Sequence, residues 1–194
     1  MKVLYLYCHP VPESFHGAIR VGALTGLAEA GHDVDFCDLY AENFDPVMRV
    51  EQRRCYHDLS TNQFGVESYV TRLRVAEAII VQFPVWCFGA PAMLKGFLDK
   101  VFLPGVSFDM SDVTQIKPLL ANLKRVAGIV TYGRGRWSAL AMGDAPRKLV
   151  TRYLPHCAIV TARAQFLPLY GMNRADETKR KAFVATVRKS MVRF

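Results

Sequence analysis

Residues 78–100 read AIIVQFPVWCFGAPAMLKGFLDK. The run Ala78–Val81 is short, apolar and uninterrupted, which is typical of a buried strand. Two prolines and a glycine then break the chain, and a helical pattern begins near Pro91, a position where proline tolerates its missing N–H. Trp86 and Phe88 therefore lie on a loop just past the carboxyl end of a strand, the edge at which open α/β sheets bind ligands. Two large rings in that place predict a flat ligand.

Length and composition predict one domain over residues 1–194. The chain is 51% hydrophobic and contains no low-complexity tract, and no apolar run reaches the roughly 18 residues of a membrane span. Its five cysteines are scattered, odd in number and without a CxxC pair. This usage favours reduced thiols in a cytoplasmic protein and argues against a zinc site, so we expect no metal.

The net charge of +8 could reflect nucleic-acid binding or a helix face exposed to solvent. Much of the excess lies in residues 174–181 and 188–193, where it alternates at helical spacing with Phe183, Val187 and Met191. This pattern favours a helix that packs its apolar side on the sheet. No recognition motif accompanies the charge, so we expect no nucleic-acid partner. The positive field still favours anionic ligands such as phosphorylated cofactors.

Strand patterns alternate with helical patterns along the chain. We expect strands over residues 2–7, 33–38, 78–83, 125–131 and 158–166, helices over 14–30 and 176–191, and a long connection over 41–65 with a short helix near 50–56. Such alternation implies right-handed crossovers and a parallel sheet. Five strands predict an α/β, flavodoxin-like doubly wound sheet in the order 2-1-3-4-5 with helices on both faces. Its ligand site would lie at the switch point between the first and third strands.

A second turn, CHPVPESFH over residues 8–16, follows the first strand. Ser14 suits a helix N-cap, and the free N–H groups beyond it would point at an anion. His9 and the Ser14 hydroxyl add side-chain donors. The turn therefore suits a phosphate, although it has neither a GxGxxG nor a Walker A sequence. Ser14 could equally be a helix cap alone, and His9 a turn histidine alone.

The third turn, TYGRGRW over residues 131–137, follows the fourth strand. Its two glycines allow close approach of a ligand or simply bend the loop. Arg134 and Arg136 are either solvated or face a phosphate or a reduced, anionic ring. Trp137 alone would suit a core or an interface, but with the two rings of the 78–100 stretch it favours a planar ligand.

Taken together, these three turns resemble those of the NAD(P)H:quinone oxidoreductase family. That family includes the modulator of drug activity B type and the potassium-efflux ancillary flavoproteins. The matching blocks lie in 7–15, 83–102 and 131–133, in the family's order, and the second is the most specific. The resemblance implies a flavodoxin-like fold, a tightly bound FAD or FMN, NAD(P)H as co-substrate, and a homodimer with active sites at the subunit interface.

The resemblance also implies a role for each matching residue. It places the flavin phosphate on His9, Ser14 and Phe15, the isoalloxazine ring on Pro84, Val85, Trp86, Cys87 and Phe88, and the pyrimidine edge on Thr131, Tyr132 and Gly133. Tyr132, Gly133 and Arg134 are the candidates for stabilising charge on the reduced ring. Phe108 matches an aromatic that reaches the partner's substrate pocket, and Trp137 is a second candidate for that pocket.

Two departures from the family pattern lie in these loops. Cys87 replaces a frequent tryptophan, and Arg134 replaces a usual second glycine. Nothing basic is adjacent to Cys87 in sequence to activate its thiol, so we interpret it as a small wall residue and not as a nucleophile.

The function implied is a two-electron, ping-pong transfer of hydride from NAD(P)H through the flavin to a quinone or similar acceptor. Two alternatives stay open. The chain could be a regulatory flavoprotein subunit of a membrane potassium-efflux transporter, which its positive charge would suit. It could also be a flavodoxin-type electron carrier, although such carriers are usually acidic.

Overall fold

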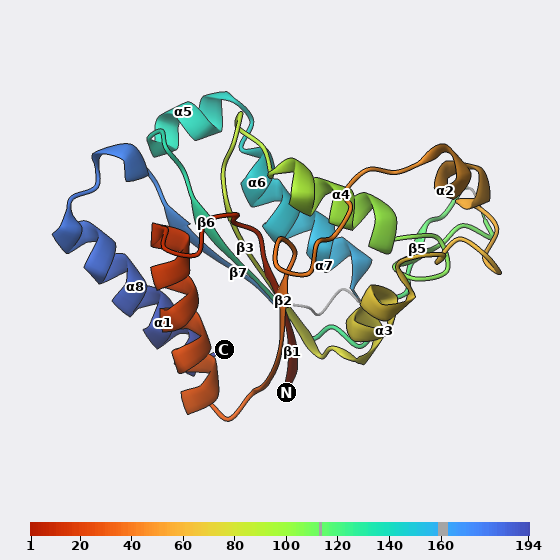
Figure 1. Ribbon diagram of the computed structural model, residues 1–194, viewed down its shortest axis with the longest axis horizontal. Helices are drawn as coiled ribbons and strands as arrows, with labels where there is room; N and C mark the ends of the chain where they lie inside the picture. The colour runs from red at the N-terminus through yellow and green to blue at the C-terminus, as the bar shows by residue number, and fades with distance from the viewer. Residues whose placement is uncertain (113, 159–162) are drawn as a thin grey trace.

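Five parallel strands form the centre of the protein (Figure 1), in a computed structural model that describes residues 1–112, 114–158 and 163–194. The strands are β1 (Lys2–Tyr7), β2 (Asp33–Asp38), β3 (Ala78–Pro84), β6 (Arg125–Thr131) and β7 (Arg163–Leu169). They lie in the order β2-β1-β3-β6-β7, and every neighbouring pair is parallel. This confirms the predicted order 2-1-3-4-5. Of the predicted fifth strand, residues 159–162 lie outside the described residues.

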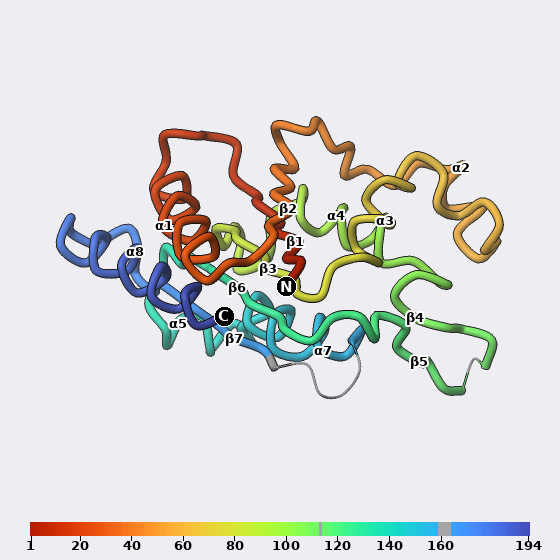
Figure 2. Tube along the Cα trace, turned by 90° about the horizontal axis from the view of Figure 1, so that it is seen from below, coloured from red at the N-terminus to blue at the C-terminus, as the bar shows by residue number. Residues whose placement is uncertain are grey.

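Helices cover both faces of this sheet (Figures 1 and 2). They are α1 (Phe15–Glu29), α2 (Val50–Cys55), α3 (Glu67–Val75), α4 (Ala92–Val101), α5 (Arg136–Ala141), α6 (Ala145–Lys148), the π-helix η1 (Leu149–Tyr153), α7 (Leu154–Cys157), the 3₁₀-helix η2 (Met172–Arg174) and α8 (Glu177–Val192). A small antiparallel pair, β4 (Phe108–Asp109) and β5 (Lys117–Pro118), lies apart from the sheet. In the described ranges, no helix is both long and apolar enough to cross a membrane.

Alternation along the strands divides the core into two halves. In β1, Val3 and Tyr5 pack with α1 and α8, whereas Leu4 and Leu6 pack with α3 and α4 on the opposite face. All four side chains are almost fully buried. A sheet that is covered on both faces needs apolar residues at successive positions, which is why its strands read as continuous apolar runs.

Local signals set the helix boundaries that the sequence predicts. The Ser14 hydroxyl caps α1 by accepting a 3.4 Å hydrogen bond from the Gly17 amide, and Gly31 after its end has a φ of +70°. Asp176 caps α8 through the Lys179 amide at 2.8 Å. α1 follows β1, so its amino-terminal end lies at the carboxyl edge of the sheet. The loops that follow β3 and β6 lie at that same edge.

Candidate functional site

Three loops meet at the carboxyl edge of the sheet, as the sequence predicts. A cavity of about 160 Å³ there is lined by Val85, Cys87, Phe88, Tyr132, Gly133, Arg134 and Asn173. The Val85 amide donates to the Thr131 carbonyl at 2.8 Å, which joins the β3–α4 loop to the end of β6. The β1–α1 loop meets the same group, because the His9 and Trp86 ring centroids are 6.4 Å apart.

The β3–α4 loop turns tightly and holds its backbone in an unusual conformation. Trp86 and Gly89 exchange two backbone hydrogen bonds, of 3.1 and 2.9 Å, around Cys87 and Phe88. Those two residues have φ values of 48° and 60°, in the left-handed region that favours glycine or asparagine. Left-handed backbone costs about 1–2 kcal/mol for a residue with a side chain. The fold therefore holds strain in the loop that lines the cavity, a recurring property of functional sites.

The β1–α1 loop presents hydrogen-bond donors. The Val11 amide donates to His9 Nδ1 at 3.1 Å, so Nδ1 is an acceptor and Nε2 carries the proton of the neutral ring. Desolvation by burial lowers the pKa of His9, which favours this neutral form. Among the described residues, neither His9 Nε2 nor the backbone N–H of Phe15 or His16 has a hydrogen-bond partner. This arrangement suits a phosphate at the start of α1.

A buried hydrogen-bond network supports these loops from below. His16 Nδ1 accepts from Gln82 Nε2 at 3.1 Å, which leaves Nε2–H to donate to Thr131 Oγ1 at 2.7 Å. Gln82 also donates to the His16 carbonyl at 2.7 Å and accepts from the Tyr5 hydroxyl. Burial lowers the pKa of His16 to about 3, with a smaller contribution from His9. The neutral imidazole thus ties α1 to β3 and β6, and the His9 ring stacks on it at 5.1 Å.

Sequence reasoning missed this network. Its one signal was Gln82, the single polar residue in an otherwise apolar strand. A buried side-chain amide must find partners, but the sequence alone does not say which residues supply them.

The Tyr132 ring lines the cavity, but its hydroxyl and its amide form hydrogen bonds away from the cavity. Its hydroxyl donates to Asp144 Oδ1 at 2.6 Å, and its amide donates to the Leu169 carbonyl at 2.8 Å. Burial and the Asp144 carboxylate raise the pKa of Tyr132 far above its usual value, so the phenol stays protonated. The phenol is therefore not a free donor toward a ligand.

The next two residues offer the donors that Tyr132 lacks. Among the described residues, no acceptor binds the backbone N–H of Gly133 or Arg134. Gly133 packs closely on Asn173, since a Cβ at position 133 would lie 3.1 Å from Asn173 Nδ2. Asn173, which follows β7, was not predicted as a site residue.

Other predicted residues lie around the cavity without lining it. Pro84 is buried at the end of β3, and the Thr131 side chain points to His16. The Phe15 ring packs against Phe183, with centroids 6.4 Å apart, so only its backbone faces the anion position.

Phe108 and Trp137 also lie away from the cavity in this chain. Phe108, on β4, lines a separate pocket of about 170 Å³ with Tyr153 and His156. Both views place the β4–β5 pair far from α5 (Figures 1 and 2). Trp137 is 82% exposed on α5. Their assignment to a partner's substrate pocket stays a prediction.

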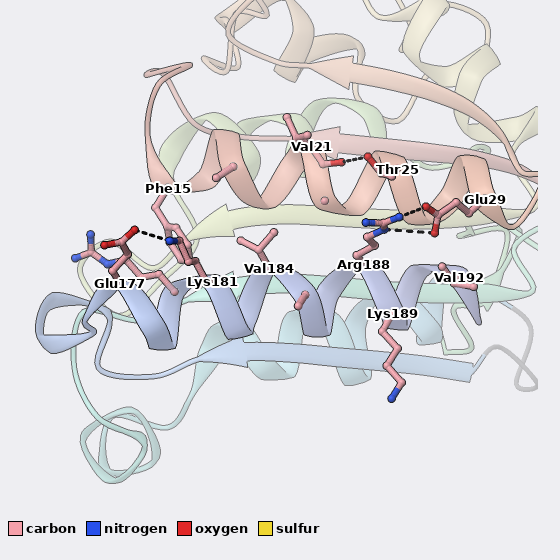
Figure 3. A pocket seen from close by; sticks show the side chains of 14 residues that line it. Phe15, Val21, Thr25, Glu29, Glu177, Lys181, Val184, Arg188, Lys189 and Val192 are labelled. Carbon is pink, nitrogen blue, oxygen red and sulfur yellow. Dashed lines mark hydrogen bonds and ion pairs between the residues drawn. The ribbon is translucent and has the colours of Figure 1, made fainter.

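A larger groove, of about 760 Å³, lies elsewhere, along α1 and α8 (Figure 3). Its apolar side chains, Val21 and Val184 among them, alternate with ion pairs such as Arg188 with Glu29. It runs along the outer side of two packed helices, and the residue it shares with the three loops is Phe15, at the start of α1. We therefore place the functional site at the smaller cavity, where donors and rings converge.

Comparison with known proteins agrees with this geometry. A family described as "Flavodoxin-like fold" matches residues 1–191. The chain is 30% identical to FMN-dependent NADH:quinone oxidoreductase 1 of Bradyrhizobium diazoefficiens, over 79% of this chain and 77% of that protein. It is 33% identical to human ribosyldihydronicotinamide dehydrogenase (quinone), over 56% of this chain and 54% of that protein, so it spans about half the length of such relatives.

A solved structure shows the same similarity. The structure of Smu.1420 from Streptococcus mutans UA159 covers 100% of both chains with a TM-score of 0.86 and 28% identity. The family match over nearly the whole chain and the similarity to the Bradyrhizobium enzyme point the same way. The chain belongs to the flavodoxin-like family that contains the NAD(P)H:quinone oxidoreductases.

Proposed function

We propose that this chain is a flavin-dependent NAD(P)H:quinone oxidoreductase. The observation that carries the proposal is that a donor-bearing helix N-terminus meets, through His9 and Trp86, the strained turn that lines the cavity. An anion site and a flat apolar wall side by side match the two ends of FMN or of the flavin half of FAD. When bound, the flavin accepts a hydride from NAD(P)H and passes it to a quinone.

The β1–α1 loop would hold the flavin phosphate. His9 Nε2–H and the backbone N–H of Phe15 would supply donors, and the positive end of the α1 dipole adds to the attraction. Ser14 would hold the His9 ring in place, because its hydroxyl lies 3.0 Å from the acceptor Nδ1. His9 is neutral and stacked on the buried His16, so it binds as a fixed donor and not as a titrating cation.

The other two loops would hold the ring. Val85, Trp86, Cys87 and Phe88 would form the wall, and Pro84 would support it from the buried end of β3. The strained turn at Cys87 and Phe88 fixes its shape. The free N–H groups of Gly133 and Arg134 would donate to the pyrimidine edge, where negative charge grows on reduction. Tyr132 contributes its ring surface, and Thr131 acts through His16 to hold the loop below.

A second copy of the chain would complete the substrate-binding side of the cavity. We propose a homodimer in which Phe108 and Trp137 cover the partner's ring face, with the acceptor quinone between them. The 82% exposure of Trp137 and the 43% exposure of Trp86 are supporting observations, because rings of that size are usually covered. We place this enzyme, a single flavodoxin-like domain, in the cytoplasm.

The alternatives are less well supported. An electron carrier of the flavodoxin type is usually acidic, whereas this chain has a net charge of +8. The Bradyrhizobium relative carries the name of an enzyme, and no observation on this chain requires a transporter partner.

The test is spectroscopic. The purified protein, alone or after addition of FMN or FAD, should be yellow, should bleach with NADPH or NADH under anaerobic conditions, and should recover its colour when a quinone is added. A colourless protein that takes up neither flavin would overturn the proposal. A yellow protein that does not bleach with either nucleotide would support the electron-carrier alternative.

A further inference from the structure

Four cationic side chains lie on segments of chain that contact Tyr170 and that adjoin the cavity-lining residues Arg134 and Asn173. We call them the cationic rim: Arg136 on α5, Arg147 and Lys148 on α6, and Lys179 on α8. Arg136 follows the cavity-lining Arg134 by two residues. Arg147 lies three residues after Asp144, whose carboxylate accepts a 3.5 Å hydrogen bond from the Tyr170 hydroxyl. The positive charges of both arginines also oppose the rise in the pKa of Tyr170 that burial and Asp144 cause. Lys179 Nζ donates to the Tyr170 carbonyl at 3.3 Å.

Lys148 completes the rim beside the same cluster. Its Nζ lies 3.7 Å from the position that a Cβ would occupy at Gly143, next to Asp144. All four rim residues are exposed. They belong to two stretches of chain, 136–148 and 170–179, which the fold brings to one end of the sheet (Figure 1).

The described acidic side chains beside the rim form no ion pair with it. Asp144 is 5% exposed and its carboxylate is bound by the Tyr132 and Tyr170 hydroxyls at 2.6 and 3.5 Å. Asp176 uses its carboxylate to cap α8 at the Lys179 amide. Within the described ranges, none of the four cations forms an ion pair. On α8, by contrast, Arg188 pairs with Glu29 and Lys181 with Glu177. The rim is therefore an unneutralised positive surface.

The rim adjoins the cavity through backbone contacts. The Gly171 amide donates to the Arg134 carbonyl and the Met172 amide to the Tyr132 carbonyl, each at 2.8 Å. These bonds join the segment that carries Tyr170 to the cavity-lining residues Arg134 and Asn173. The flavin phosphate has its own donors on the β1–α1 loop, so the rim remains for a second anionic ligand.

We propose that the cationic rim binds the phosphates of the hydride donor and makes NADPH the preferred nucleotide over NADH. This inference rests on the proposed function. NADPH differs from NADH by one 2′-phosphate, and that group is a doubly charged acceptor suited to the planar fork of an arginine. Two arginines and two lysines without acidic partners give such a group favourable contacts that NADH lacks.

Kinetics with both nucleotides test the proposal. At low ionic strength we expect kcat/KM for NADPH to exceed that for NADH by about tenfold or more, since one charge-assisted contact is worth roughly that factor. The double variant Arg136→Ala/Arg147→Ala should lose most of this preference through a higher KM for NADPH. Its kcat/KM for NADH should change less. Arg54→Ala on α2, an exposed arginine without an ion pair among the described residues, is the matched control and should keep the preference.

A binding measurement separates the rim from the redox cycle. In calorimetric titrations, 2′,5′-ADP should bind the protein more tightly than 5′-AMP, and the double variant should lose the difference. This titration gives a result whether or not flavin is bound. Equal affinities, or equal use of NADPH and NADH by a protein that bleaches with both, would overturn this inference and leave the proposed function intact. Failure to take up flavin would overturn the proposed function instead.

Discussion

Tyr132 and Asp144 are joined by a 2.6 Å hydrogen bond that spans the β6–α5 loop and α5. Asp144 has a left-handed backbone, with φ 43°, and is almost fully buried. A carboxylate in that setting needs donors, and the Tyr132 hydroxyl supplies the shorter bond, with Tyr170 at 3.5 Å. The bond fixes the loop that carries the free N–H groups of Gly133 and Arg134. The geometry of the candidate site therefore depends on a polar pair whose hydrogen bond joins the cavity-lining Tyr132 to the buried Asp144.

Tyr132→Phe should destabilise the protein. The substitution leaves the buried Asp144 carboxylate without its short donor, which costs about 1–3 kcal/mol. Urea unfolding at pH 7.5 measures the loss. Tyr170→Phe is the control and should cost less, because its bond to Asp144 is long. Equal losses in both variants, or no loss in Tyr132→Phe, would contradict a structural role for the pair.

Trp86→Ala should weaken flavin binding far more than Cys87→Ala. Trp86 contributes a large, 43% exposed ring to the proposed wall, whereas Cys87 contributes a small side chain. Loss of one ring contact should raise the dissociation constant about tenfold, in the range of an aromatic interaction with its buried area. Fluorescence titration of the flavin-free protein with FMN and with FAD measures it. Equal weakening in both variants would show that the ring does not lie on Trp86.

The fold could be predicted from the sequence because each strand has a recognisable run of apolar residues within its own few positions. β1 and β6 have the predicted bounds, since apolar runs in a sheet covered on both faces are unmistakable, and Ser14 and Asp176 mark helix starts by their own chemistry. α3 was missed because only Val70 and Leu73 are buried, too few to set a period. The short helices between 136 and 157 also escaped prediction.

The candidate site could also be predicted only in part. Its three loops could be placed because they follow strand ends, and parallel strands end at one edge. The contacts that hold the loops could not. The bond between His16 and Thr131 joins residues 115 positions apart, and the approach of Asn173 to Gly133 depends on a segment after β7. Such contacts depend on packing, which has no local signature in the sequence.

His16 should make stability depend on pH. Burial lowers its pKa from 6.5 to about 3, so below pH 6.5 the unfolded chain binds a proton that the folded protein does not. The free energy of unfolding should therefore fall by about 1.4 kcal/mol per pH unit as the pH drops from 6.5 toward 5. Above pH 6.5 this contribution is constant.

The difference between wild type and His16→Gln isolates that contribution. Urea unfolding at pH 7.5, 6.0 and 5.0 should show a steeper decline for wild type by nearly one proton. Parallel curves for the two proteins would mean that His16 titrates normally in the fold.

Gly17→Ala should damage the proposed phosphate loop selectively. A Cβ at position 17 would lie 2.0 Å from the Pro12 carbonyl oxygen, so the backbone of the β1–α1 loop must move. That movement shifts Ser14 and the donors at the start of α1, and a displacement of about 1 Å is enough to cost a large factor in a site built on geometry. Gly135→Ala is the matched control, because a Cβ there meets nothing within 4 Å and its φ of −72° suits alanine. We expect FMN and FAD affinity to fall in Gly17→Ala and to persist in Gly135→Ala, as measured by titration of the flavin-free proteins. Circular dichroism should show both variants folded at 25 °C, since overpacking typically costs about 1–3 kcal/mol. A folded Gly17→Ala protein with unchanged flavin affinity would mean that the phosphate lies somewhere other than the start of α1.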